Sequence, residues 1–208
     1  MSIPPDLQQY VEQEIIPRYD HFDQAHQRDH VLMVIKQSLD LADQLHVDKN
    51  MAYVIAAFHD TGLCEGREHH HEVSAHIIRH DPQLPRWFSQ QQIITMAEAA
   101  EDHRASSSHA PRSIYGRIVA EADRFIDPNT IIKRTIQYGL DHYPEHSREQ
   151  HYQRMVQHLQ EKYGRHGYLH LWFPNSPNSA RLEKLQLMID DEEQLKNAFD
   201  TYFPNNHH

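Results

Sequence analysis

The sequence predicts an all-α protein, a single-domain helical bundle followed by a C-terminal helical appendage. No segment of the 208 residues alternates apolar and polar side chains as a half-buried strand would. Apolar residues instead recur every three or four positions, which is the spacing of one helix face. Cys64 is the only cysteine, so the fold cannot depend on an internal disulfide, and the chain is long enough to bury a core without one.

Capping residues and prolines divide the chain into nine expected helices. The first ends before Pro17, because proline cannot continue a helix. Another begins at Asp48, a good N-cap, and ends at Thr61-Gly62, since glycine tolerates a left-handed exit. The expected helices cover about 6–16, 29–45, 48–61, 71–79, 90–103, 111–125, a segment that starts at 127, 147–163 and 176–199.

The boundary between the bundle and the appendage is expected near residue 140. Asp127-Pro128 starts a new helix, because aspartate is a favoured N-cap and proline a favoured first helical residue. We therefore expect residues 1–140 to form the first domain and residues 141–208 a helical extension or cap.

The net charge of the chain limits the kinds of molecule that it is expected to bind. Lys and Arg number 20 and Asp and Glu 30, so the formal charge is −10, which disfavours non-specific binding to nucleic acid. The sequence contains no apolar run long enough to span a membrane. Its first residues lack the basic-then-apolar pattern of a secretory signal, so we expect a cytoplasmic protein. The sequence leaves a homodimer open.

Four side chains form a candidate metal site: His30, the pair His59-Asp60, and Asp123. Two imidazoles and two carboxylates suit a catalytic divalent cation. Because the chain has 20 histidines, a single histidine is normally a surface or packed residue, and a pair such as Asp102-His103 arises by chance. The order of the four residues, each on an apolar helical segment, is what distinguishes them.

The four residues and their context resemble the HD-domain superfamily of metal-dependent phosphohydrolases, which carry H…HD…D on a helical bundle. The resemblance covers residues 24–127, with Thr61-Gly62 where many members have Ile-Gly. It implies that His30, His59, Asp60 and Asp123 bind a divalent metal ion. It also implies hydrolysis of a phosphate ester or anhydride, of a nucleotide or another small phosphorylated metabolite, by metal-activated water.

A second metal is expected in some branches of this superfamily, through two further histidines. His70, four residues before Ser74, and His103 resemble these two positions, with His71 as the other choice for the first of them. The alternative is that residues 69–71 form a solvated turn and that His103 caps a helix end. The mixed ligands are compatible with Mn, Fe, Co, Ni, Zn or Mg, and the imidazoles favour Mn or Fe over Mg.

Catalysis would need further groups beside the metal. Asp60 is suited to orient or deprotonate water, and the nearby Glu65 and Glu68, with His70 and His103, are candidate proton donors to the leaving oxygen. Flanking arginines are candidates for binding phosphate, because a guanidinium matches its geometry. The better placed of these are Arg67 and Arg104, ahead of Arg124, and each is otherwise a surface charge.

Two other functions compete with a phosphohydrolase. A dinuclear-iron oxygenase of the same superfamily would require all six ligands. A metal-binding or ligand-sensing module without turnover is the other alternative, because the C-terminal half matches no family that the sequence suggests.

Overall fold

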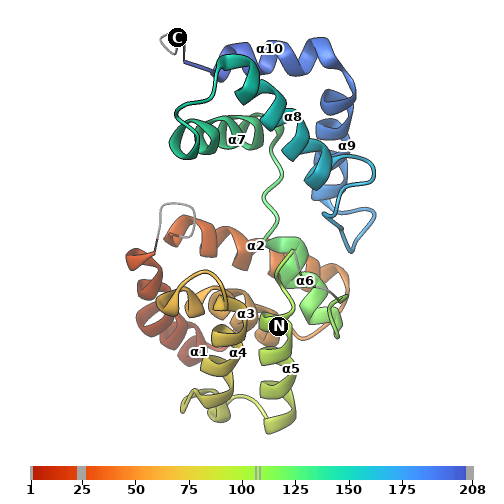
Figure 1. Ribbon diagram of the computed structural model, residues 1–208. Helices are drawn as coiled ribbons and strands as arrows, with labels where there is room; N and C mark the ends of the chain where they lie inside the picture. The colour runs from red at the N-terminus through yellow and green to blue at the C-terminus, as the bar shows by residue number, and fades with distance from the viewer. Residues whose placement is uncertain (1, 23–26, 106, 108, 205–208) are drawn as a thin grey trace. The chain divides into compact units, whose positions relative to one another are not determined.

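The computed structural model describes residues 2–22, 27–105, 107 and 109–204, and within them it contains ten α-helices and no strand (Figure 1). The predicted all-α class is confirmed. Residues 24–26, at the start of the region of resemblance, lie outside the described residues. The chain divides between Arg124 and Phe125 into two compact units. No helix in the described ranges is both long and apolar enough to cross a membrane.

The division lies earlier than the boundary expected near residue 140. That position falls inside α7 (Pro128–His142), and α7 packs against α8 and α10 of the second unit. Its stripe of Ile131, Ile132 and Ile136 is buried. A helix that buries its apolar face in one core cannot belong to another domain, so the whole of α7 belongs to the second unit.

The first unit is built around α3. Its helices are α1 (Pro5–Tyr10), α2 (Arg28–Gln44), α3 (Lys49–Phe58), α4 (His70–His80), α5 (Gln90–Glu101) and α6 (Ile114–Ala122). Every residue from Met51 to Phe58 is buried, and α3 contacts α2, α5 and α6. A helix that is apolar on all sides is held by neighbours on all sides. Asp48 caps its start as expected, accepting the amide N–H of Asn50 at 2.8 Å.

The expected end of the first helix before Pro17 is wrong. The α-helix ends at Tyr10, a wider π-helical turn, η1 (Val11–Ile15), follows, and a 3₁₀ segment, η2 (Ile16–His21), runs through the proline. Pro17 stands in the first turn of η2, where a helix does not need its missing N–H. The chain therefore stays helical to His21.

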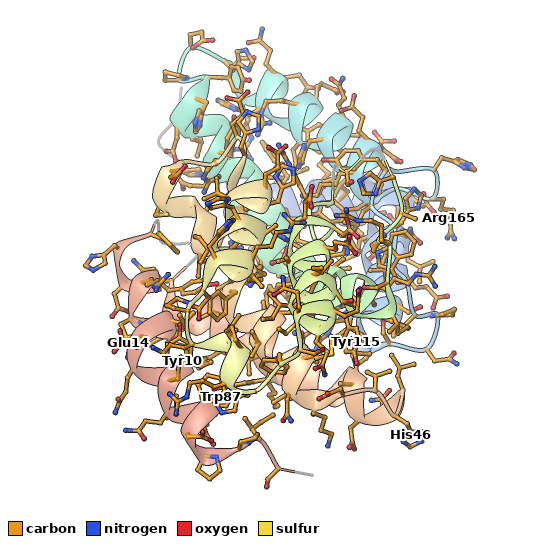
Figure 2. The ribbon with its side chains drawn as sticks, turned by 90° about the horizontal axis from the view of Figure 1, so that it is seen from below. Tyr10, Glu14, His46, Trp87, Tyr115 and Arg165 are labelled. Carbon is orange, nitrogen blue, oxygen red and sulfur yellow. The ribbon has the colours of Figure 1, made fainter. Side chains whose placement is uncertain are left out.

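Aromatic and polar contacts hold α1 against the connection between α4 and α5. The rings of Tyr10 and Trp87 stack with their centroids 5.7 Å apart (Figure 2). The Trp87 indole N–H donates to Asp6 at 2.8 Å, and the Tyr10 hydroxyl donates to Asp81. The N-terminal segment is thus an integral part of the first unit.

The second unit consists of α7 and three further helices, α8 (Arg148–Tyr163), α9 (Pro177–Asp190) and α10 (Glu192–Tyr202). The single helix expected over 176–199 is wrong, because the chain is extended at Asp191. The Asp191 carboxylate accepts the amide N–H of Gln194 at 3.0 Å and caps α10. The acidic run 190–193 explains the break, since negative charge stabilises the start of a helix and destabilises its end.

Candidate metal centre

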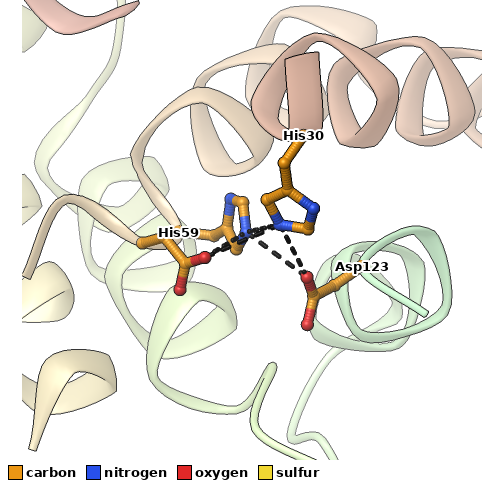
Figure 3. A group of neighbouring side chains, drawn as sticks. His30, His59 and Asp123 are labelled. Atoms are coloured by element: carbon orange, nitrogen blue, oxygen red, sulfur yellow. Dashed lines mark hydrogen bonds and ion pairs between the residues drawn. The ribbon is translucent and has the colours of Figure 1, made fainter. Parts of the chain in front are cut away.

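Three helices bring His30, His59, Asp60 and Asp123 together. His30 lies in the first turn of α2, His59 and Asp60 follow α3 directly, and Asp123 follows α6. One ligand atom from each lies within 4.8 Å of the others. The Nε2 atoms of His30 and His59 are 3.3 Å apart, and His30 Nε2 is 3.1 Å from Asp123 Oδ1. Figure 3 shows His30, His59 and Asp123 directed at one another, so this group of residues can hold a cation.

A second group shares Asp60 with the first. Its members are Asp60, His70 and His103, again within 4.8 Å. Asp60 Oδ1 is 3.4 Å from the Nε2 atoms of both His70 and His103, whereas Oδ2 is 3.2 Å from His59 Nε2. The two carboxylate oxygens therefore face different histidine pairs. His71 is not a member, since its Nε2 faces Glu72 at 3.8 Å.

Backbone carbonyls set the tautomer of three of these histidines. The Nδ1 atoms of His59, His70 and His103 each contact the carbonyl oxygen three residues earlier. Those carbonyls belong to Ala56, Arg67 and Ala100. A carbonyl only accepts, so each Nδ1 carries a proton, and Nε2 is the atom that faces the centre and is left to bind a proton or a cation. This is the arrangement of a metal-binding histidine.

The facing histidines test whether a cation fits. The Nε2 atoms of His70 and His103 are 3.2 Å apart, and both present lone pairs. Two lone pairs cannot satisfy each other, so the pair requires a proton or a metal ion between them. Asp60 supplies negative charge beside them and is almost fully buried. The nitrogen and oxygen donors therefore fit a divalent cation.

The charge of the ligands agrees with that fit. Burial alone would lower the pKa of His59, but the carboxylates of Asp60 and Asp123 outweigh it and raise the pKa well above its usual value. Burial would also raise the pKa of Asp60, yet His59 and His103 hold it well below its ordinary range. The carboxylates are thus ionised at neutral pH and favour positive charge between them.

Helix ends add to the negative potential. The C-cap residues of α3, α5 and α6 are His59, Asp102 and Asp123. All three are candidate ligands or neighbours of one, so three helices direct their C-termini at the centre. Because the C-terminus of a helix carries a partial negative charge, this arrangement favours a cation.

The structure leaves the two acidic candidates for the proton donor in solvent, whereas the other two candidates, His70 and His103, lie in the second ligand group. Glu65 is exposed at the end of η4 (Thr61–Glu65), and the Glu68 side chain is 88% exposed, with its carboxylate 3.7 Å from His69. Neither carboxylate is brought into the two ligand groups. Sequence spacing placed them near the metal, but the side chains on this turn point outward.

Of the two candidate phosphate-binding arginines, Arg104 is the one whose guanidinium is held by a hydrogen bond to the backbone. Its guanidinium Nη1 donates to the carbonyl of Glu68 at 2.8 Å and so ties the end of α5 to the segment before α4. Arg67 is exposed, and its carbonyl accepts the His70 Nδ1–H at 2.8 Å. Both arginines therefore border the second ligand group through the segment that leads into His70.

Asp102 supports the centre, although the sequence made Asp102-His103 look like a chance pair. The Asp102 carboxylate is buried and accepts the Arg112 backbone N–H at 2.7 Å. The Arg112 guanidinium also donates to it, through Nη2 at 2.8 Å and Nε at 3.0 Å. This bidentate pair fixes the backbone next to His103. The only signal in the sequence was that Asp102 stands next to a candidate ligand. Its partner Arg112 lies ten residues later, and no spacing rule identifies such a partner.

Arg112→Ala is expected to destabilise the first unit by about 2–4 kcal/mol, because it leaves the buried Asp102 carboxylate without its charged partner. Urea unfolding followed by circular dichroism measures this change. Arg79→Ala is the matched control. Arg79, on α4, forms a more exposed ion pair at 3.5 Å with Glu101, the residue on α5 that precedes Asp102. The control should lose under about 1 kcal/mol. Equal losses in the two variants would show that the Asp102 pair has no special role.

Comparison with protein-family models matches residues 28–126 to the family described as HD domain. The matched range contains all six residues of the two ligand groups. Comparisons with curated proteins and with solved structures found no significant match.

Proposed function

Because residues 28–126 of this chain are an HD domain, we propose that the protein is a metal-dependent phosphohydrolase. Its substrate would be a phosphate ester or anhydride, of a nucleotide or another small phosphorylated metabolite, cleaved by metal-activated water. One observation carries the proposal: Asp60 directs one oxygen at His59 and the other at His70 and His103.

We assign the ligands from the two groups. His30, His59, Asp60 and Asp123 would hold the first cation, and Asp60, His70 and His103 the second. A bound divalent cation supplies an activated water and neutralises charge on a phosphoryl group. The donor set admits Mn, Fe, Co, Ni, Zn or Mg, with Mn or Fe preferred because imidazoles are poor ligands for Mg.

The remaining steps fall to side chains of the chain itself. Asp60 lies between the two groups, where its carboxylate can orient the attacking water or accept its proton. Arg104 and Arg67 border the second group and would bind the phosphate oxygens. Glu65 and Glu68 stay the proposed proton donors to the leaving oxygen, as exposed groups on the segment that precedes His70.

The test combines metal binding with turnover. The purified chain, freed of metal with EDTA and reloaded with Mn²⁺, is assayed for phosphate release from nucleoside mono-, di- and triphosphates and from p-nitrophenyl phosphate esters. We expect release only with metal. Mn²⁺ at 100 times its dissociation constant should also stabilise the fold by about 2.7 kcal/mol, measured as a rise in the melting temperature.

Two histidine variants make the assay specific. His59→Ala should lose the Mn²⁺ ion of the first group and with it turnover, because His59 is a fully buried candidate ligand of that group alone. His80→Ala is the matched control, an exposed histidine at the end of α4, and should behave as wild type. If wild type binds Mn²⁺ tightly and hydrolyses none of these substrates, the chain is a metal-binding module without turnover.

A dinuclear-iron oxygenase is the second candidate, favoured by the sharing of Asp60 between two ligand groups. It would bind two iron ions per chain and consume O₂ without releasing phosphate. Iron counting in wild type and in His103→Ala, together with an oxygen electrode, separates it from the phosphohydrolase.

A further inference from the structure

We propose that Tyr19, which lies outside the matched range, is a positioning residue of the metal centre that holds the backbone of Asp60 through its buried hydroxyl. This inference rests on the proposed function only in that the centre binds metal. Tyr19 belongs to η2 and is fully buried. Its role therefore comes from the N-terminal segment and not from the HD domain itself.

The Tyr19 hydroxyl makes two hydrogen bonds at the end of α3. It donates to the carbonyl oxygen of Ala57 at 2.9 Å and accepts the backbone N–H of Asp60 at 3.3 Å. These two residues flank Phe58 and His59, so one hydroxyl ties both ends of the turn that carries two ligands. The ring also lies beside His59, with centroids 6.3 Å apart.

Three successive carbonyls at this helix end have side-chain partners. The last carbonyls of a helix have no intrahelical donor and must be satisfied in another way. The Ala56 carbonyl accepts from His59 Nδ1, and the Phe58 carbonyl accepts from the Thr61 hydroxyl at 2.7 Å. The Ala57 carbonyl, between them, accepts from Tyr19, which lies 38 residues earlier in the chain.

A hydrogen bond to the Asp60 backbone has a large effect on the centre, because the position of the Asp60 carboxylate matters to both ligand groups. Both carboxylate oxygens of Asp60 are used, one toward each ligand group, so a rotation that improves one contact lengthens the other. Metal ligands must be held within about 0.5 Å and 10–20° of their working geometry. Fixing the Asp60 N–H fixes the starting point of that side chain.

The N-terminal segment keeps Tyr19 in place. Leu7, Val11, Ile15 and Ile16 are buried in the same core, and the Phe22 ring packs edge-on against Tyr19 with centroids 5.2 Å apart. A phenol hydroxyl holds its proton at neutral pH, so the Tyr19 hydroxyl is available to donate to the Ala57 carbonyl.

Tyr19→Phe tests the proposal by removing the hydroxyl and keeping the ring. We expect its Mn²⁺ affinity, measured by calorimetric titration of the metal-free full-length chain, to fall about 10- to 100-fold, the usual cost of losing an outer-shell partner. The melting temperature of the metal-free protein is measured in parallel.

Two variants separate positioning from stability. Tyr53→Phe removes a hydroxyl from another buried tyrosine, on α3, and should bind Mn²⁺ as wild type does. Thr61→Val removes the neighbouring cap of the Phe58 carbonyl, and should lower the melting temperature with a smaller loss of affinity than Tyr19→Phe.

The outcomes are distinct. Tyr19→Phe with wild-type Mn²⁺ affinity and a lowered melting temperature would overturn the inference, because Tyr19 would then serve stability alone. Failure of Tyr19→Phe to unfold cooperatively, where Thr61→Val still does, would overturn it in the same way. Absence of Mn²⁺ binding in the wild type would contradict the proposed function instead.

Discussion

Asp60→Asn is expected to remove both metal ions at once and to lower phosphate release by about 10³-fold or more. An asparagine side chain has nearly the same size but only one acceptor oxygen, so it cannot serve both ligand groups. Its amide N–H groups can donate to imidazole lone pairs, so the metal-free variant should still fold. Mn²⁺ bound per chain, counted by elemental analysis after dialysis, and the turnover rate are the measurements.

Two single-group variants are the controls for Asp60→Asn. Asp123 belongs to the first group alone and His103 to the second alone. Asp123→Asn and His103→Ala should therefore each lose one ion and keep the other. If Asp60→Asn still binds two ions, or loses no more than Asp123→Asn does, the shared carboxylate is not the link between the groups.

Gly62→Ala is expected to destabilise the first unit by about 3 kcal/mol and to disrupt the second ligand group before the first. A Cβ at Gly62 would lie 2.0 Å from the carbonyl oxygen of His70 and 2.6 Å from the backbone N of Ser74. Both are backbone atoms, so the first turn of α4 must move as a whole and carry His70 with it. The Gly62 N–H would also lose its 2.9 Å hydrogen bond to the Ser74 hydroxyl.

Gly66→Ala is the matched control in the same loop. Gly66 has a φ of +105°, but nothing lies within 4 Å of the position its Cβ would take. The cost is then backbone strain alone, about 1–3 kcal/mol, with no displacement of His70. Urea unfolding and Mn²⁺ counting should show a weaker effect on stability and two bound ions. Loss of the second ion in Gly66→Ala, or its retention in Gly62→Ala, would contradict the steric explanation.

Local signals predicted most of the helices. Asp48 and Asp127 accept hydrogen bonds from amides in the first turns of α3 and α7, as expected of N-caps. The helix breaks were harder to predict, because they depend on competition between periodicity and local charge. The apolar spacing over 176–199 continues through Asp191, and only the acidic run at that point shows why the helix stops there.

The candidate ligands, and the fact that they lie together, could be predicted from their order in the sequence, but the residues that support them could not. His30, His59, Asp60 and Asp123 stand in a recognisable sequence context. Tyr19, by contrast, depends on how an N-terminal segment packs beneath α3, and Arg112 on how the chain returns after α5. Such contacts join positions that have no fixed spacing, so they become visible only in three dimensions.

Because one carboxylate belongs to both candidate ligand groups, cations bound to the two groups would be linked thermodynamically. Whatever the first ion does to the orientation and charge of Asp60 changes the free energy of binding the second. Linkage makes that effect equal in both directions, whichever ion binds first. A chain that binds both ions in this way would have one coupled binding isotherm in place of two independent ones. Positive coupling would make metal loading depend more steeply on metal concentration, and negative coupling more gradually.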